Sequence, residues 1–246
     1  MKYVPNLITL LNLMFGSVAA VFAVLNHLEW AAFFFLLGVV CDFLDGLAAR
    51  ALGVQSELGI QLDSLADMIT SGLVPGLVMC QMLGMSLSGG WNSGSFFVDA
   101  LTREGWLQAW FPFSGLLITL ASGWRLARFN IDENQVSSFI GLPTPANALL
   151  IISLPLIVLY NGSEFTNSVL LNPWFLSILT LLSAFLLNSP IELFALKFKG
   201  WGFAENAVKY IFLLVGAVLV ITLQYLAIPL VILLYILLSV VGKKSA

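Results

Sequence analysis

The chain has 246 residues, of which 60% are hydrophobic and 9% are charged, and its mean hydropathy is +1.00. Soluble globular proteins are roughly 45–50% apolar and about 25% charged, so this composition excludes a soluble domain and predicts an integral membrane protein. The formal net charge of −3 is too small to indicate a nucleic-acid partner, and we expect none.

The apolar runs predict a single all-α domain over residues 1–246, a polytopic membrane bundle of about eight transmembrane helices. A spanning helix needs about 20 mostly apolar residues. The fifth, sixth and eighth expected segments are short, so the number of spans can fall by one or two. The expected segments are Pro5–Leu25, Trp30–Arg50, Leu58–Leu83, Trp106–Phe129, Pro145–Tyr160, Asn172–Leu187, Ala207–Gln224 and Ala227–Val241.

The basic residues predict how the helices are oriented. Positive charge is retained on the cytoplasmic side of a membrane. If the chain starts in the cytoplasm and crosses eight times, nine of its ten basic residues lie at cytoplasmic ends or loops, and only Arg103 lies outside. This agreement favours an even number of spans in the cytoplasmic membrane. The nine residues are Lys2, Arg50, Arg125, Arg128, Lys197, Lys199, Lys209, Lys243 and Lys244.

Four aspartates lie inside or at the edge of the second and third apolar runs. If both runs are helical, Asp42 and Asp45 share one face of the first helix, and Asp63 and Asp67 form a stripe on the second. The short link between the runs makes the helices antiparallel neighbours, so the two acidic faces can meet. Because buried charges in a membrane are costly, we expect hard cations, Mg²⁺ or Mn²⁺, to hold these oxygens together.

Two glycines lie on the same faces as the acids. We expect Gly46 and Gly59 to let a ligand approach the metals where a side chain would block it. The Asp45-Gly46 pair is also a turn signal, so a break in the helix is the alternative; the apolar residues on both sides favour a helix. Asn6, Thr9 and Asn12 form a polar stripe on the first helix that faces a nucleotide or packs against another helix.

The aspartates and glycines, together with Ala49 and Arg50, form a pattern over residues 42–67. It resembles the signature of the CDP-alcohol phosphotransferase family at all eight fixed positions. The resemblance implies a six-helix core followed by two C-terminal helices, a homodimer, and two divalent cations. In this family CDP linked to a lipid or an alcohol reacts with an alcohol hydroxyl group, and CMP leaves. The matching positions are Asp42, Asp45, Gly46, Ala49, Arg50, Gly59, Asp63 and Asp67.

The resemblance also implies a role for each acid. Asp42, Asp45 and Asp63 would be the principal metal ligands. Asp67 would be the general base that removes the acceptor's hydroxyl proton, and it would also touch a metal.

The remaining motif positions would form the nucleotide site. Gly46, Ala49 and Gly59 would bring the cytidine phosphates close to the backbone. Arg50 would contact a phosphate, although a positively charged anchor at a cytoplasmic helix end is the ordinary alternative.

Three softer segments, at residues 124–130, 141–146 and 196–199, resemble the members of this family that use serine. They imply CDP-diacylglycerol and L-serine as substrates, and phosphatidylserine and CMP as products. The orientation that the basic residues predict makes the active site face the cytoplasm. Arg125 and Arg128, spaced i and i+3, would bind the serine carboxylate or the lipid phosphates; membrane anchoring is the alternative for both.

Two other functions stay open at this stage. The same chemistry with glycerol phosphate or inositol phosphate as acceptor would need a strongly basic pocket, which the two arginines do not exclude. A cation transporter would use the four carboxylates as a permeation site. It would also need polar residues on several helices through to the outer face, where the sequence is apolar.

Overall fold

The computed structural model describes residues 3–91, 94–100, 109–131, 139–193 and 203–242. This part of the chain is almost entirely helical, which confirms the all-α expectation. Its β structure is a two-stranded antiparallel ribbon in which Phe139 pairs with Leu193 and Ile140 with Glu192.

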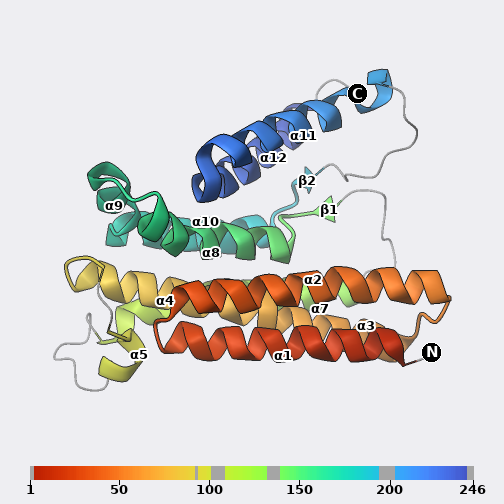
Figure 1. The fold of residues 1–246 in the computed structure, drawn as a ribbon, viewed down its shortest axis with the longest axis horizontal. Coiled ribbons are helices and arrows are strands. Elements are labelled where there is room, and N and C mark those ends of the chain that lie inside the picture. The colour runs from red at the N-terminus through yellow and green to blue at the C-terminus, as the bar shows by residue number, and fades with distance from the viewer. Residues whose placement is uncertain (1–2, 92–93, 101–108, 132–138, 194–202, 243–246) are drawn as a thin grey trace.

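The N-terminal half forms a layer of long helices packed side by side, at the bottom of Figure 1. The third helix of this layer is a single rod, because a π-helical segment joins α3 directly to α4. The elements of this half are α1 (Val4–Val24), α2 (Leu28–Leu52), α3 (Glu57–Asp67), the π-helix η1 (Met68–Leu73), α4 (Val74–Leu87), the short α5 (Phe96–Asp99), the 3₁₀-helix η2 (Phe111–Leu116) and α7 (Leu117–Ile131).

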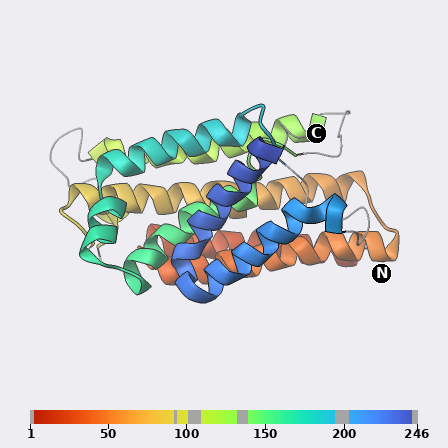
Figure 2. The same cartoon turned by 90° about the horizontal axis from the view of Figure 1, so that it is seen from above.

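The C-terminal half lies above this layer. Helices α8 and α10 pack on α4, and α12 packs on α8. Helices α11 and α12 lie side by side as a hairpin that crosses over the bundle at an angle (Figure 1, Figure 2). The elements are β1 (Phe139–Ile140), α8 (Thr144–Tyr160), α9 (Glu164–Leu170), α10 (Pro173–Asn188), β2 (Glu192–Leu193), α11 (Phe203–Leu223), the 3₁₀-helix η3 (Gln224–Leu226) and α12 (Ala227–Gly242).

Each of the eight expected segments contains a helix, but the structure does not confirm eight spans. Four helical stretches within the described residues are long and apolar enough to cross a membrane: Val4–Val24, Leu28–Leu52, Glu57–Leu87 and Lys209–Val240. The number rises to five if α9 and α10, which meet at 58°, form one broken span. These helices indicate an integral membrane protein.

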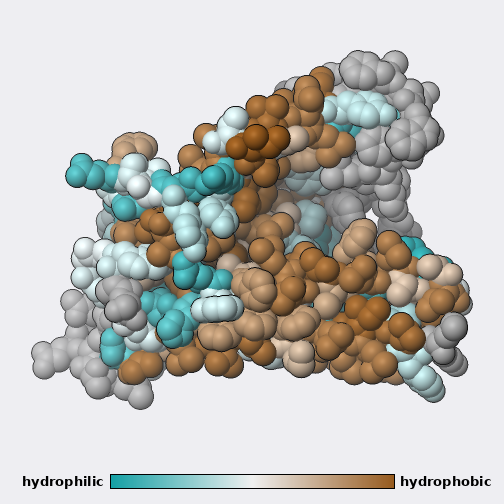
Figure 3. Space-filling view, in the orientation of Figure 1, coloured by the Kyte–Doolittle hydropathy of each residue, from teal (hydrophilic) through white to brown (hydrophobic). Residues whose placement is uncertain are grey.

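The surface agrees with a membrane setting. Apolar residues cover most of the face formed by α1, α2 and the C-terminal hairpin, and polar residues gather toward the end of the molecule that holds α9 (Figure 3). The core lies around α4, where Met79, Cys80, Met82 and Leu83 have no exposed surface. Cys80 and Cys41 are both free thiols.

Candidate active site

Two neighbouring helices carry the acidic residues, and their ends explain why both helices form. Helix α2 continues through Asp45 and Gly46 to Leu52, so the turn reading of this pair is wrong. It ends where Gly53 adopts a left-handed conformation with φ of 63°. Helix α3 begins after Ser56, whose hydroxyl group accepts a hydrogen bond from the Gly59 backbone N–H at 3.1 Å.

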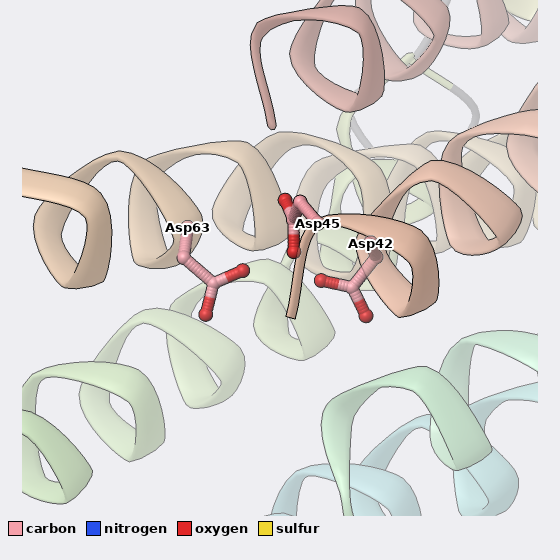
Figure 4. Close-up of side chains that lie close together, drawn as sticks. All are labelled: Asp42, Asp45 and Asp63. Carbon is pink, nitrogen blue, oxygen red and sulfur yellow. The ribbon is translucent and has the colours of Figure 1, made fainter. Parts of the chain in front are cut away.

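Three carboxylates converge between these helices. Asp42 and Asp45 project from α2 and Asp63 projects from α3 (Figure 4). One oxygen of each lies within 4.8 Å of the other two, which is a spacing that a shared metal ion can bridge. The Asp45 side chain is 6% exposed, and its Oδ2 atom has no hydrogen-bond partner among the described residues. A buried carboxylate oxygen without a donor is suited to bind a cation.

Asp67 lies beside this group without belonging to the three-residue cluster. It is the last residue of α3, and its carboxylate is a hydrogen-bond neighbour of Asp42. Asp67 therefore lies at the edge of the metal cluster, one helical turn beyond Asp63.

Gly46 and Gly59 differ from the glycines that pack the bundle. A Cβ atom added to Gly46 would meet only the flexible guanidinium group of Arg50, at 3.6 Å or more. A Cβ atom on Gly59 would lie 3.3 Å from the side-chain oxygens of Asn6 and Ser56. A side chain at Gly46 therefore meets open space and one flexible group, whereas a side chain at Gly59 would press on Asn6 and Ser56.

Arg125 and Arg128 share helix α7 but have different surroundings. Arg125 is half-buried, and its positive charge attracts the carboxylate of Asp67. Its buried Nε atom has no hydrogen-bond partner among the described residues. Arg128 is exposed. The spacing of the two arginines does not distinguish them, whereas the structure brings only Arg125 to the acidic cluster.

The polar stripe on α1 faces the acidic helices. The Thr9 hydroxyl group lies beside the Asp45 carboxylate, and the Asn6 side chain lies near Gly59. Asn12 contacts the π-helix instead, through a hydrogen bond from Thr70. The packing alternative therefore holds for Asn12, and Asn6 and Thr9 stay candidates for the nucleotide site.

The sequence analysis does not predict a contact between α3 and α7 next to the acids. Ser64 on α3 and Asn130 on α7 exchange hydrogen bonds of 2.9 and 3.1 Å, so the C-terminal end of α7 is fastened beside the acids. No motif marks this pair, because the two residues are 66 positions apart. Lys197 and Lys199, and the whole segment 196–199, lie outside the described residues.

The sequence matches a known family. A family model described as CDP-alcohol phosphatidyltransferase matches residues 2–186. Three relatives named CDP-diacylglycerol–serine O-phosphatidyltransferase are similar to the chain. The protein of Bacillus subtilis strain 168 is 29% identical over 158 residues, which cover 63% of this chain and 76% of the relative. The protein of Methanocaldococcus jannaschii is 29% identical over 189 residues, or 77% and 72% of the two chains.

The third relative, from Helicobacter pylori strain 26695, is 32% identical over 150 residues. That match covers 60% of this chain and 55% of the relative, so the chain spans just over half the length of the Helicobacter protein.

Proposed function

Because the chain belongs to the CDP-alcohol phosphatidyltransferase family, we propose that it transfers the phosphatidyl group of CDP-diacylglycerol to the hydroxyl group of L-serine. The products are phosphatidylserine and CMP. The observation that carries this proposal is the convergence of Asp42, Asp45 and Asp63 from two membrane helices. The names of the similar proteins support serine as the acceptor.

The donor set fits hard divalent cations. The three converging side chains offer only oxygen atoms, which Mg²⁺ and Mn²⁺ prefer. Asp42, Asp45 and Asp63 would hold the ions, and Asp67 would reach them from the edge of the cluster. When bound, two such ions would neutralise the pyrophosphate and stabilise the attacking and leaving oxygens of an in-line displacement.

The chain's own residues would complete the reaction. The serine hydroxyl oxygen forms a bond to the phosphatidyl phosphorus, the bond from that phosphorus to the CMP oxygen breaks, and the hydroxyl proton passes to Asp67. Asp67 suits this task because it is next to the cluster and is not one of its three converging members. The CMP group departs with the electron pair of the broken bond.

The nucleotide and the acceptor would occupy opposite sides of the acids. Gly46 and Gly59 admit the cytidine phosphates, Ala49 keeps the same face of α2 small, and Arg50 supplies a positive charge above Gly46. On the side of α7, Arg125 would bind the serine carboxylate, because a guanidinium group binds a carboxylate through two parallel hydrogen bonds. Arg128, which is exposed, would contact lipid phosphates at the surface.

We also propose a setting for the enzyme. The acids, the end of α2 with Arg50, and the end of α7 with Arg128 lie at one end of the bundle, and clustered basic residues favour the cytoplasmic side. The protein would be a homodimer in the cytoplasmic membrane, as the family resemblance implies. Light scattering of the detergent-solubilised protein, corrected for bound detergent, tests the dimer.

The assay of the proposed reaction uses purified protein, CDP-diacylglycerol, labelled serine, and Mg²⁺ or Mn²⁺. We expect labelled phosphatidylserine and an equal amount of CMP. Glycerol 3-phosphate and inositol phosphate are offered in parallel. Transfer to either of these with none to serine contradicts the choice of acceptor, and cation flux into proteoliposomes without CMP release contradicts the enzyme itself.

A further inference from the structure

The π-helix η1 begins at the residue after Asp67 and carries a buried threonine. Thr70 is 1% exposed and lies against both α1 and α2. π-Helical turns are rare and occur frequently at functional sites. Here the extra residue of the π turn lies directly beyond the proposed general base, so the way in which η1 is fixed also fixes the end of α3.

Thr70 is held by two glycines. A Cβ atom on Gly16 of α1 would lie 2.2 Å from the Thr70 Oγ1 atom, and a Cβ atom on Gly38 of α2 would lie 2.8 Å from its Cγ2 atom. Real Cβ atoms do not come this close to a neighbour, so both backbones approach Thr70 only because these positions are glycines.

A hydrogen bond completes the contact. The Thr70 hydroxyl group donates to the Asn12 Oδ1 atom at 2.8 Å. Asn12 has no exposed surface, and its Nδ2 atom has no partner among the described residues. The bond from Thr70 is therefore the interaction that orients a buried amide, and an unmade bond at this place would be costly.

The position of this contact along the helices matters for the acids. Gly38 precedes Asp42 by four residues, and Thr70 follows Asp67 by three, so each lies about one helical turn from an acid. Helix α2 and the α3–α4 rod are thereby held at one relative height. A change of that height would move Asp42 and Asp45 together with respect to Asp63.

We propose that Thr70 is a positioning residue for metal binding: by packing between Gly16 and Gly38 and donating to Asn12, it sets the register in which the aspartates of α2 meet Asp63. The inference rests on the proposed function only in taking the acidic cluster to be a cation site. Thr70 itself touches neither cation nor substrate.

The test measures Mn²⁺ affinity of the purified protein without substrates, by the electron paramagnetic resonance signal of free Mn²⁺, together with the thermal unfolding midpoint. Gly38→Ala introduces the collision with Thr70. Gly84→Ala is the matched control. Gly84 lies on the half of α4 that is far from the acids, and its added Cβ atom would lie 2.7 Å from Phe96 of α5. Gly38→Ala combined with Thr70→Ser removes the methyl group that the new Cβ atom meets at 2.8 Å, and leaves the flexible Asn12 side chain 3.0 Å away.

Gly38→Ala is expected to weaken Mn²⁺ binding by about 10- to 100-fold, the range for residues that orient metal ligands. Gly84→Ala is expected to lower the unfolding midpoint and to bind Mn²⁺ as the wild type does. The combined variant is expected to recover part of the lost affinity. Thr70→Val, which keeps the branched shape, removes the donor and sets a methyl group against the Asn12 Oδ1 atom, is expected to weaken binding.

Three results would overturn the inference: Gly38→Ala and Thr70→Val bind Mn²⁺ as the wild type does, Gly84→Ala loses as much affinity as Gly38→Ala, or the combined variant recovers none. The readout needs no turnover. Wild-type protein that binds Mn²⁺ but makes no phosphatidylserine would therefore contradict the proposed function and leave the role of Thr70 standing.

Discussion

Replacement of Asp67 by asparagine separates proton removal from metal binding. The two side chains have the same size, and the amide group of the Asp67→Asn variant can still donate a hydrogen bond to Asp42, the neighbour of this position. The amide cannot accept the serine proton. We therefore expect the variant to fold and to bind divalent cations and nucleotide, while the chemical step loses its base.

The expected size of the effect follows from the role. General base catalysis contributes about 10²- to 10⁴-fold, which corresponds to about 2.7–5.4 kcal/mol of transition-state stabilisation at about 1.36 kcal/mol per tenfold change in rate. The loss should fall on kcat, and the KM for CDP-diacylglycerol should change little, because Asp67 lies outside the three converging carboxylates.

The assay follows incorporation of labelled serine into lipid, and calorimetry with CMP and Mn²⁺ measures nucleotide binding. Asp99→Asn, which changes an exposed carboxylate on α5, is the control and should keep full activity. Wild-type turnover in Asp67→Asn would refute the assignment of the base. A loss of turnover matched by an equal loss of Mn²⁺ affinity would make Asp67 a principal metal ligand and not the base.

Three further changes test the rest of the site. Asp63→Asn should weaken nucleotide binding in the presence of Mn²⁺ and leave the weak binding in its absence unchanged, as calorimetry would show; equal affinities with the metal present would argue against its role as a ligand. Gly46→Ala should lower activity by about 10- to 100-fold through displaced phosphates with an unchanged unfolding midpoint, since its Cβ atom meets only the end of Arg50; a large loss of stability would instead indicate a packing role. Arg125→Lys should raise the KM for serine about tenfold or more, since Lys binds a carboxylate at a single point. Arg128→Lys should leave this KM unchanged. Kinetics with varied serine compare the two variants, and equal effects would contradict the assignment.

The spacing of residues predicted the acidic cluster because helical geometry is local. Once α2 and α3 are helices with a short link, Asp42 and Asp45 must face the helix that carries Asp63. The same rule could not place Arg125 relative to Arg128. Both point to roughly one side of α7, and their different exposure depends on the packing of other helices around that one.

The parts that sequence could not supply depend on long-range contacts. The π-helix after Asp67 has no sequence signal. It depends on the packing of Thr70 between two glycines that lie 54 and 32 positions earlier in the chain. The number of spans was also beyond reach, since α7, α8, α10 and α12 have between 15 and 17 residues each. Hydropathy alone does not decide whether helices of that length cross a membrane.

Binding of Mn²⁺ to the purified protein tests the account most directly, because the whole proposal depends on Asp42, Asp45 and Asp63 acting as one cation site. Electron paramagnetic resonance of the wild type should show saturable binding that Mg²⁺ displaces, and the variant with all three aspartates changed to asparagine should lose it while remaining folded. Identical titrations of the wild type and this variant would contradict the account.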